Sequence, residues 1–540
     1  MRGRSSLFGF AVRSHLLGAL SCGIGGGIAM WVIAVGYVRE MATFEGGATA
    51  FGAFTAAAAE AMRIMRWPAD RLDTLGGYLT YHNLILLPLL LGLYAVVQGA
   101  QALRGVEEKR VLELWLATGR MRWWIAIVRA TAFFVALALV TVFVAIGLVA
   151  ATVTGGEMQL GSALVVAGEA SLTAGVFYAL AMLLSSVLAT SGMAAGVTAL
   201  VMTALYMLTN VWDRLGAFEW VRFLSPFYYR QRSELLIPGR EIDLAATAVL
   251  VCMFAGLVVL AAYAFTRRDY GAALWRPTER ARDHTRATRL AWRPMLWLAS
   301  TAEQRVGLLA WAGGAGVFMG AYALLIPQVQ EMWDRMGFMK VFLPSGGSAG
   351  SQVVALAVEM LGPLVAAFAI AQSARWARER ADGRDELVLA QPISRARFVL
   401  ERLVALVVGA LIVVAGALAG LAIGTTAADV TLDTGALART TGDLALLALA
   451  VGGVGAIAVV AFRGPGAIVF LTIWIVGAYL VVLFAPLFDW PAWVPRLSLF
   501  DAFGRPYLGA PDVYGLSYLA ALAVAGAALA IAMLERRRAA

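Results

Sequence analysis

The chain has 540 residues, of which 61% are hydrophobic and 14% are charged, and its formal net charge at pH 7 is +9. A soluble domain carries about 25% charged residues, so this composition excludes an ordinary soluble protein and indicates a polytopic membrane protein. The two cysteines, Cys22 and Cys252, both fall inside apolar runs, so the sequence indicates neither a disulfide framework nor a metal site.

Apolar runs recur along the whole sequence, and a helix needs about 20 apolar residues to cross the hydrocarbon core. We therefore predict an all-α membrane protein with about twelve transmembrane helices, arranged as two fused six-helix repeats. The predicted spans are residues 14–38, 79–103, 124–153, 162–189, 192–212, 243–265, 304–326, 351–374, 398–425, 437–462, 465–487 and 512–534. They divide the chain into a first six-span half (1–266), a cytoplasmic linker (267–303) and a second six-span half (304–540).

The distribution of arginine predicts the orientation of the spans. Five Arg-rich segments alternate with segments poorer in arginine: 2–13, 104–129, 267–293, 375–402 and 536–538. Because cytoplasmic loops of membrane proteins carry an excess of Lys and Arg, we expect these segments and both termini in the cytoplasm. The basic N-terminus also resembles a signal peptide, but the apolar run continues to Val38, which favours a first transmembrane helix.

The charged segment 104–129 joins the second and third predicted spans. Its helical spacing places one face in water, formed by Arg110, Glu113, Ala117 and Arg120. The opposite face is apolar and contains Leu112, Trp115 and Leu116. The segment is therefore predicted to form a short amphipathic helix at the membrane surface.

The same pattern returns in the second half of the chain at one constant offset. Glu113, Leu114, Leu116, Ala117, Arg122 and Arg129 match Glu386, Leu387, Leu389, Ala390, Arg395 and Arg402. Trp220, Val221, Leu224, Ser225 and Phe227 match Trp493, Val494, Leu497, Ser498 and Phe500 at that offset. Matched Trp, Glu and Arg in a chain rich in Ala and Leu indicate an internal duplication.

Three segments between the spans are expected to lie on the outer side. Residues 51–67 predict a surface helix that ends at Pro68. Residues 210–243 and 486–512 contain Trp, Tyr, Phe and Pro with scattered charges, which is typical of short helices at a membrane interface.

Polar residues within the spans are candidates for a substrate path, because an intramembrane carboxylate costs about 2.5–3.5 kcal/mol unless it has a partner or lines water. Glu359 lies closest to mid-depth, whereas Glu169 and Asp443 lie near the outer ends of their spans, where they can reach lipid head groups. The candidates for the path are Tyr94, Gln98, Tyr206, Asn210, Glu359, Gln372, Trp474 and Tyr479. Packing and pairing with a neighbouring Arg are the alternative roles for these side chains.

The sequence contains no phosphate-binding loop of the Walker type. Such a loop needs a Lys followed by Ser or Thr, but Lys109 precedes Arg110 and Lys340 precedes Val341. Any energy from ATP must therefore come from another polypeptide. The three histidines, His15, His82 and His284, are dispersed and form no metal or catalytic motif.

The charged segment after the second span resembles the ABC-2 type permease family. The residues that carry the resemblance are Glu107, Glu108, Glu113, Leu116, Ala117 and Thr118. With both halves included, the chain is similar to the fused twelve-span permeases of actinobacterial tetronasin-resistance and multidrug exporters. The second copy departs from the pattern, because it has one additional residue before Glu386 and a proline, Pro392, after it.

The resemblance implies that each amphipathic helix docks on a separate ATPase subunit, present in two copies, which binds ATP and Mg; this chain binds no cofactor of its own. The residues implied in docking are Glu107, Glu108, Arg110, Glu113, Leu116, Arg120, Arg122, Glu379, Arg384, Glu386, Leu389 and Arg395. It further implies export of an amphipathic drug, antibiotic or lipid-like compound across a bacterial plasma membrane, with lipid but no nucleic acid as a partner.

Two other functions fit parts of the sequence. A proton-coupled secondary multidrug transporter also has two six-span halves, but its second and third spans are joined by a tight loop and not by a long amphipathic helix. A membrane-embedded transferase needs clustered carboxylates or histidines in the outer loops, and Asp489, Asp501 and Asp512 are dispersed.

Overall fold

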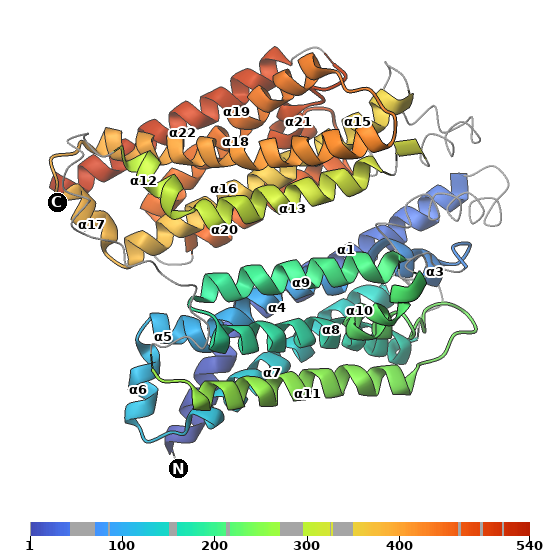
Figure 1. The fold of residues 1–540 in the computed structure, drawn as a ribbon. Helices are drawn as coiled ribbons and strands as arrows, with labels where there is room; N and C mark the ends of the chain where they lie inside the picture. Colours follow the sequence, from blue (N-terminus) through green and yellow to red (C-terminus); the bar gives the residue numbers. More distant parts are fainter. Residues whose placement is uncertain are drawn as a thin grey trace. The chain divides into compact units, whose positions relative to one another are not determined.

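The computed structural model describes residues 2–43, 71–84, 87–150, 159–211, 216–270, 295–324, 326–327, 349–462, 466–485, 490–509 and 512–539. These residues form helices and connecting segments with no β-strand, so the prediction of an all-α protein is confirmed for the described part of the chain. The chain divides into two compact units, Met1–Arg282 and Asp283–Ala540, which are coloured from blue to green and from yellow to red in Figure 1. The surface helix predicted at 51–67 lies outside the described residues.

Ten helices in the described ranges are long and apolar enough to cross a membrane. They are Leu7–Val38, Leu87–Glu108, Arg122–Ala150, Leu160–Val187, Ser191–Asn210, Leu244–Arg267, Val354–Ala381, Arg395–Ala427, Thr434–Ala461 and Val513–Arg536. Two of the twelve predicted spans differ from these. The span at 304–326 belongs to a helix pair bent by 64°, and the apolar part of the span at 465–487, Gly466–Val482, is shorter than the other ten.

Unit 1 is a bundle around α8 (Leu160–Val187). α8 contacts α4 (Leu87–Ala100), α7 (Arg122–Ala150) and α11 (Leu244–Arg267), whereas α1 (Arg2–Thr43) packs along α7 and α9 (Ser191–Val211) contacts α4 and α8 (Figure 1). At the centre the rings of Phe133 and Tyr178 are stacked with centroids 3.9 Å apart.

Unit 2 shows the same sequence of helix contacts. α19 (Thr434–Ala461) contacts α16 (Leu361–Ala381), α18 (Arg395–Ala427) and α22 (Val513–Ala539), and α13 (Arg305–Ala323) packs along α18. α20 (Gly466–Phe484) contacts α16 and α19. A short helix, α15 (Ala349–Glu359), precedes α16, and α12 (Leu296–Glu303) precedes α13.

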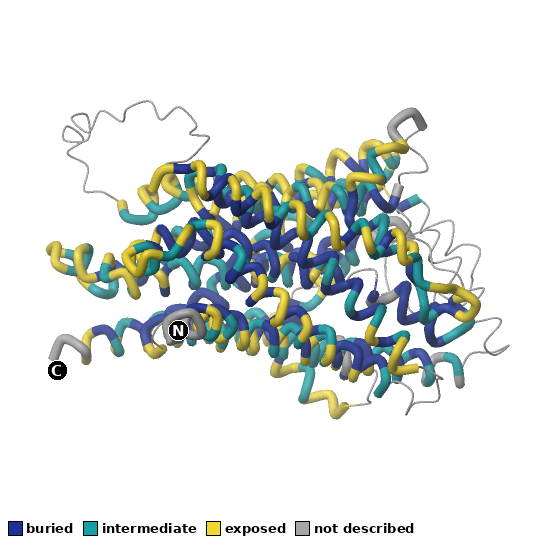
Figure 2. The backbone as a smooth tube through the Cα atoms, turned by 90° about the horizontal axis from the view of Figure 1, so that it is seen from below, coloured by how far each residue is buried: buried dark blue, intermediate teal, exposed yellow. Residues whose placement is uncertain are grey.

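Buried and exposed positions alternate along the helices of both units (Figure 2). Many exposed side chains are large and apolar, such as Leu90 and Val259 in unit 1 and Ile423 and Val524 in unit 2, each at least 61% exposed. A helix with apolar residues on both its buried and its exposed faces is typical of a protein whose outer surface contacts lipid.

Short helices also lie in the two aromatic segments between spans, as the sequence predicts. They are η5 (Gly216–Leu224) and α10 (Pro226–Arg230) in unit 1, and η8 (Pro495–Leu497) and α21 (Leu499–Phe503) in unit 2. These helices contact α9 and α11 in unit 1 and α19, α20 and α22 in unit 2. In Figure 1, α10 and α21 lie at the end of their unit opposite to the charged helices α6 (Val111–Ala117) and α17 (Arg384–Leu389), respectively.

Candidate functional site

The charged segment of unit 1 forms two separate pieces and not one surface helix. The π-helix η2 (Gln101–Gly105) and α5 (Val106–Glu108) continue α4, and α6 (Val111–Ala117) begins after Arg110, whose φ of 56° is left-handed. The segment from Glu107 to Arg122 is therefore not one continuous helix. The left-handed residue breaks the helix, so that Glu107 and Glu108 belong to the end of the second span.

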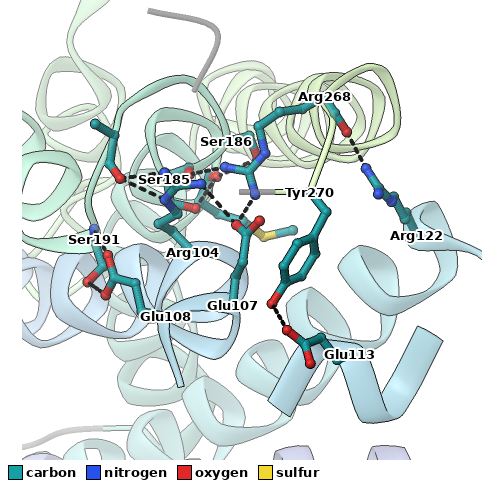
Figure 3. A network of polar contacts seen from close by, with 12 residues as sticks. Arg104, Glu107, Glu108, Glu113, Arg122, Ser185, Ser186, Ser191, Arg268 and Tyr270 are labelled. Atoms are coloured by element: carbon teal, nitrogen blue, oxygen red, sulfur yellow. Dashed lines mark hydrogen bonds and ion pairs between the residues drawn. The ribbon is translucent and has the colours of Figure 1, made fainter. Parts of the chain in front are cut away.

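Glu107 is the centre of a buried ion network (Figure 3). Its Oε2 lies 3.1 Å from Nη1 of Arg104 and also accepts a hydrogen bond from Arg268, and the three residues are at most 7% exposed. Nε of Arg104 donates to the carbonyl of Ala189 at 2.8 Å. The network joins the ends of α4, α8 and α11, so Glu107 does not lie on a docking surface.

Glu108 caps the first turn of α9. The backbone N–H of Ser191 donates to Oε1 of Glu108 at 2.8 Å, and the Ser191 hydroxyl donates to Oε2 at 2.6 Å (Figure 3). A carboxylate at this position stabilises the helix N-terminus. Glu108 is exposed, but both of its oxygens are engaged within the unit.

α6 is anchored by a buried leucine and exposes a glutamate and a second leucine that are neighbours in sequence. Leu112 is 2% exposed and anchors the helix in the core, whereas Leu114 is 68% exposed and the neighbouring Glu113 is also exposed. The hydroxyl of Tyr270 donates to Oε1 of Glu113 at 2.7 Å, and this bond raises the pKa of Tyr270 (Figure 3). Trp115 and Leu116 pack against the core of unit 1, which confirms the predicted apolar face of the helix.

The other predicted docking residues of unit 1 flank α6. Arg110 is exposed before the helix, and Arg120 is half-buried after it. Arg122 begins α7, donates to the carbonyl of Arg268 and lies over the ring of Phe265 at 5.9 Å. Arg122 therefore fastens the start of α7 to the end of α11.

Unit 2 has a related charged helix, α17 (Arg384–Leu389), which follows Gly383 at a left-handed φ of 74°. Its anchor is ionic, because Asp385 is 4% exposed and lies 3.2 Å from Nη2 of Arg402 and 3.1 Å from Nε1 of Trp376. Burial raises the pKa of Asp385, and the charge of Arg402 opposes that shift. Glu379 completes the network at 2.5 Å from Arg402.

The exposed surface of α17 resembles that of α6. Glu386 is exposed, the neighbouring Leu387 is 73% exposed, and Arg384 is also exposed. Leu389 is half-buried, and Arg395 donates to the carbonyl of Leu534 near the end of α22. A groove of about 570 Å³ opens beside the helix, lined by residues that include Arg380, Asp385, Glu386, Leu389, Arg395 and Phe462.

The candidates for a substrate path in unit 1 lie in the packed interior. The hydroxyl of Tyr94 donates to the carbonyl of His15 at 3.1 Å, and Oε1 of Gln98 lies 3.0 Å from Nδ1 of His15. Tyr206 is 2% exposed and packs edge-on against Phe227, and Asn210 is fully buried. The structure thus brings Tyr94 and Gln98 together around His15.

The candidates in unit 2 occupy three different places. Glu359 ends α15 and lies 3.1 Å from Nε of Arg505. Gln372 lines a small pocket together with Arg375 and Arg402. Trp474 and Tyr479 are half-buried in α20, with the ring of Tyr479 edge-on to Phe500 at 5.5 Å.

Glu169 does not lie at the surface, contrary to the expectation that it reaches lipid head groups. It is 3% exposed, and its Oε1 accepts a hydrogen bond of 2.6 Å from Thr247 of α11. Arg230, 2% exposed, interacts with it electrostatically. Asp443 is half-buried.

Sequence reasoning missed four residues of the ion networks in the two units: Arg104, Arg268, Arg375 and Asp385. Helical spacing could have indicated two of the ion pairs, because Arg104 precedes Glu107 by three residues and Arg375 precedes Glu379 by four. No such spacing could have indicated the pair of Arg268 with Glu107, because these two residues are distant in sequence. In the part of the chain that the structure describes, no group of three or more His, Cys, Asp or Glu side chains could hold a metal ion.

Residues 291–534 match the family model described as the C-terminal domain of the multidrug efflux system permease Rv1217c. No curated protein matches the chain. Together with the apolar helices of the described residues, this match supports a multi-pass membrane protein with the transport role of a permease.

Proposed function

We propose that the chain is the permease subunit of an ABC exporter that moves amphipathic drugs, antibiotics or lipid-like compounds out of a bacterial cell. In this proposal the chain has twelve spans, the bent pair and the short α20 included, and both termini are cytoplasmic. The observation that carries it is the exposed Glu–Leu pair on a firmly anchored short helix, which is found in each unit: Glu113 and Leu114 on α6, and Glu386 and Leu387 on α17.

The two units are proposed to be copies of one six-span element, and matched contacts support this. Ser225 donates to the carbonyl of Leu205, and Ser498 donates to the carbonyl of Ala478, over the same separation in sequence. Two ring contacts are related by the same offset. The rings of Tyr206 and Phe227 lie edge-on with centroids 5.3 Å apart, and those of Tyr479 and Phe500 lie edge-on with centroids 5.5 Å apart. Equivalent residues thus make equivalent contacts.

A pair of separate ATPase subunits is proposed to bind α6 and α17. An exposed Leu beside a carboxylate provides apolar area and a charge for a partner. ATP and Mg would be bound by these partners. The residues available for contact are Arg110, Glu113 and Leu114 in unit 1 and Arg384, Glu386 and Leu387 in unit 2.

The buried networks provide a route from the docking helices to the spans. In unit 1 a force on α6 reaches α4 through the short segment 109–110. Arg104 connects the end of α4 to α8, Glu107 connects it to α11, and Glu108 connects it to α9. In unit 2 Asp385 and Glu379 connect α17 to α18 through Arg402. Closure of the ATPase pair would thereby shift an equilibrium between inward-open and outward-open states, which is alternating access.

The double substitution Glu113→Arg with Glu386→Arg tests this proposal. Both side chains are exposed, so we expect the protein to fold normally and its melting temperature to be unchanged. Reversal of the two charges is expected to lower ATP-dependent export at least tenfold, about 1.4 kcal/mol in coupling free energy. Export of a fluorescent amphipathic dye and ATP hydrolysis are measured in vesicles that contain the permease and its ATPase.

The matched control is Glu219→Arg with Glu241→Arg, which makes the same charge change at two exposed positions between α9 and α11. This control should export normally. Normal export by the Glu113→Arg, Glu386→Arg protein would contradict docking through α6 and α17.

A second candidate, proton-coupled multidrug transport, is favoured by one observation. Glu169 is buried within a span beside the buried Arg230, and a carboxylate in that setting can serve as a proton carrier in a secondary transporter. In an ATP-driven permease the same carboxylate needs only to fix α8 to α11 through Thr247. The two functions differ in their energy source, which a transport assay measures directly.

A further inference from the structure

One arginine of unit 1 is buried without a carboxylate partner. Arg129 lies in the second turn of α7 and is 5% exposed. Its Nε has no hydrogen-bond partner, and no acidic side chain among the described residues forms an ion pair with it. Its guanidinium lies 5.9 Å from the ring centre of Trp115 on α6. A buried cation without a counterion is strongly unfavourable, so a function that needs the charge is indicated.

A buried histidine lies close to this arginine. His15 of α1 is 1% exposed, and its ring lies edge-on to Phe133, one helical turn after Arg129 in α7, with centroids 5.4 Å apart. Its Nδ1 lies 3.0 Å from Oε1 of Gln98, which only accepts hydrogen bonds, so Nδ1 carries the proton and Nε2 of the neutral ring is an acceptor. Nε2 is buried and has no partner in the described part of the chain. The site thus presents a cation and an unsatisfied acceptor.

The equivalent arginine of unit 2 has the carboxylates that Arg129 lacks. Arg402 lies 2.5 Å from Glu379 and 3.2 Å from Asp385. The residue of unit 1 at the position of Asp385 is Leu112, at the constant offset that relates Arg129 to Arg402. Glu107 ends the second span as Glu379 does, but it is engaged by Arg104 and Arg268. Unit 1 therefore retains the arginine without its counterions.

We infer that Arg129 and His15 bind the phosphate head group of a single-chain or lipid amphiphile at the α6 end of unit 1. A singly protonated phosphate fits both groups, because its oxygens accept from the guanidinium and its hydroxyl donates to Nε2 of His15. The rings of Phe10, 56% exposed, and Trp115 lie edge-on at 6.1 Å and offer apolar surface for the alkyl chain. Because Trp115 belongs to α6, the ligand would contact the helix that we assign to coupling.

The test is equilibrium binding of labelled dodecyl phosphate to the purified full-length chain in a neutral detergent. We expect saturable binding that weakens at least tenfold in Arg129→Met. Without ligand this variant should melt at the same temperature as the parent or higher, because it removes an unpaired buried charge. If Arg129 had a structural role, its replacement would lower the melting temperature. The melting temperature therefore distinguishes a ligand-binding role from a structural one.

Two further variants keep the test decisive. His15→Leu should weaken binding at least threefold. This variant still tests the site if Arg129→Met does not fold. Arg13→Met removes an exposed arginine from the same helix as His15 and should bind as the parent does. Unchanged affinity in Arg129→Met or in His15→Leu, or an equal loss in Arg13→Met, would overturn the site.

Competitors distinguish the source of the phosphate. Displacement of bound dodecyl phosphate by vesicles of phosphatidic acid in phosphatidylcholine assigns the site to a membrane lipid. Displacement by dodecyl phosphate analogues but not by these vesicles assigns it to a transported compound. Strong competition by the cation dodecyltrimethylammonium would refute an anion site. The assay uses the permease alone, so its outcome does not depend on whether an ATPase drives transport.

Discussion

Asp243 is the residue before α11, and it stabilises that helix in its ionised form. Its Oδ1 accepts the backbone N–H of Ala246 at 2.9 Å, and its Oδ2 lies 2.7 Å from Nε of Arg232. The hydrogen bond from Ala246 lowers the pKa of Asp243 in the folded state. Folding therefore favours the ionised carboxyl, so the stabilisation is complete above the ordinary pKa of about 4 and is lost as the pH falls through the lower folded value.

Substitution Asp243→Ala is expected to cost about 1 kcal/mol at pH 7, because an N-cap is lost. Asp243→Asn should retain most of the cap. Thermal unfolding of the full chain in detergent is measured from pH 7 to pH 3. The gap between the parent and Asp243→Ala should narrow as the pH falls, whereas Asp269→Ala, at an exposed position after α11, should match the parent throughout. A gap that is independent of pH would contradict the role of the charge.

The exposure or burial of a single side chain could be predicted from the sequence only where residues close to it in the chain determine it. The exposed Glu113 and Glu386 follow from helical spacing on a polar face, and the structure has them exposed. Glu107 was misplaced for two reasons. The spacing continues through Arg110, which adopts a left-handed conformation that sequence does not reveal, and the buried partner Arg268 comes from a distant part of the chain.

Helix pairs in both units approach closely through glycine. In unit 2 the backbones of α13 and α18 meet at Gly316, Gly320, Gly416 and Gly420, and a Cβ added at Gly420 would lie 1.9 Å from the carbonyl oxygen of Gly316. Small residues four apart permit such contact where lipid supplies no hydrophobic driving force. The spans themselves could be predicted from apolar runs. The helix against which each span packs could not, because Ala and Gly recur on several faces of most helices.

Gly420→Ala is therefore expected to destabilise unit 2 by about 1–3 kcal/mol, because the methyl group forces the two helices apart. Gly313→Ala is the matched control, since a Cβ at Gly313 on α13 meets nothing within 4 Å. Thermal unfolding of the two variants in the same detergent gives the comparison. Equal stability of Gly420→Ala and Gly313→Ala would contradict the close packing of α13 on α18.

Each unit taken by itself contains the same order of helix contacts, with α8 and α19 at the centre of their bundles. The all-helical class and most spans could be predicted from hydropathy alone. The bend of 64° between α12 and α13 could not, because hydropathy does not reveal where a helix breaks; at the start of α12 the N–H of Trp297 donates to Oε2 of Glu401, which is distant in sequence, at 3.3 Å.

The source of energy separates an ATP-driven permease from a proton-coupled transporter. Export of a fluorescent amphipathic dye is measured in vesicles that contain the full chain, with its ATPase and ATP in one set and with a proton gradient alone in the other. We expect export only in the first set, and loss of export when ATP is withheld. Export by the chain alone, driven by the proton gradient without ATP, would contradict the assignment to an ABC exporter.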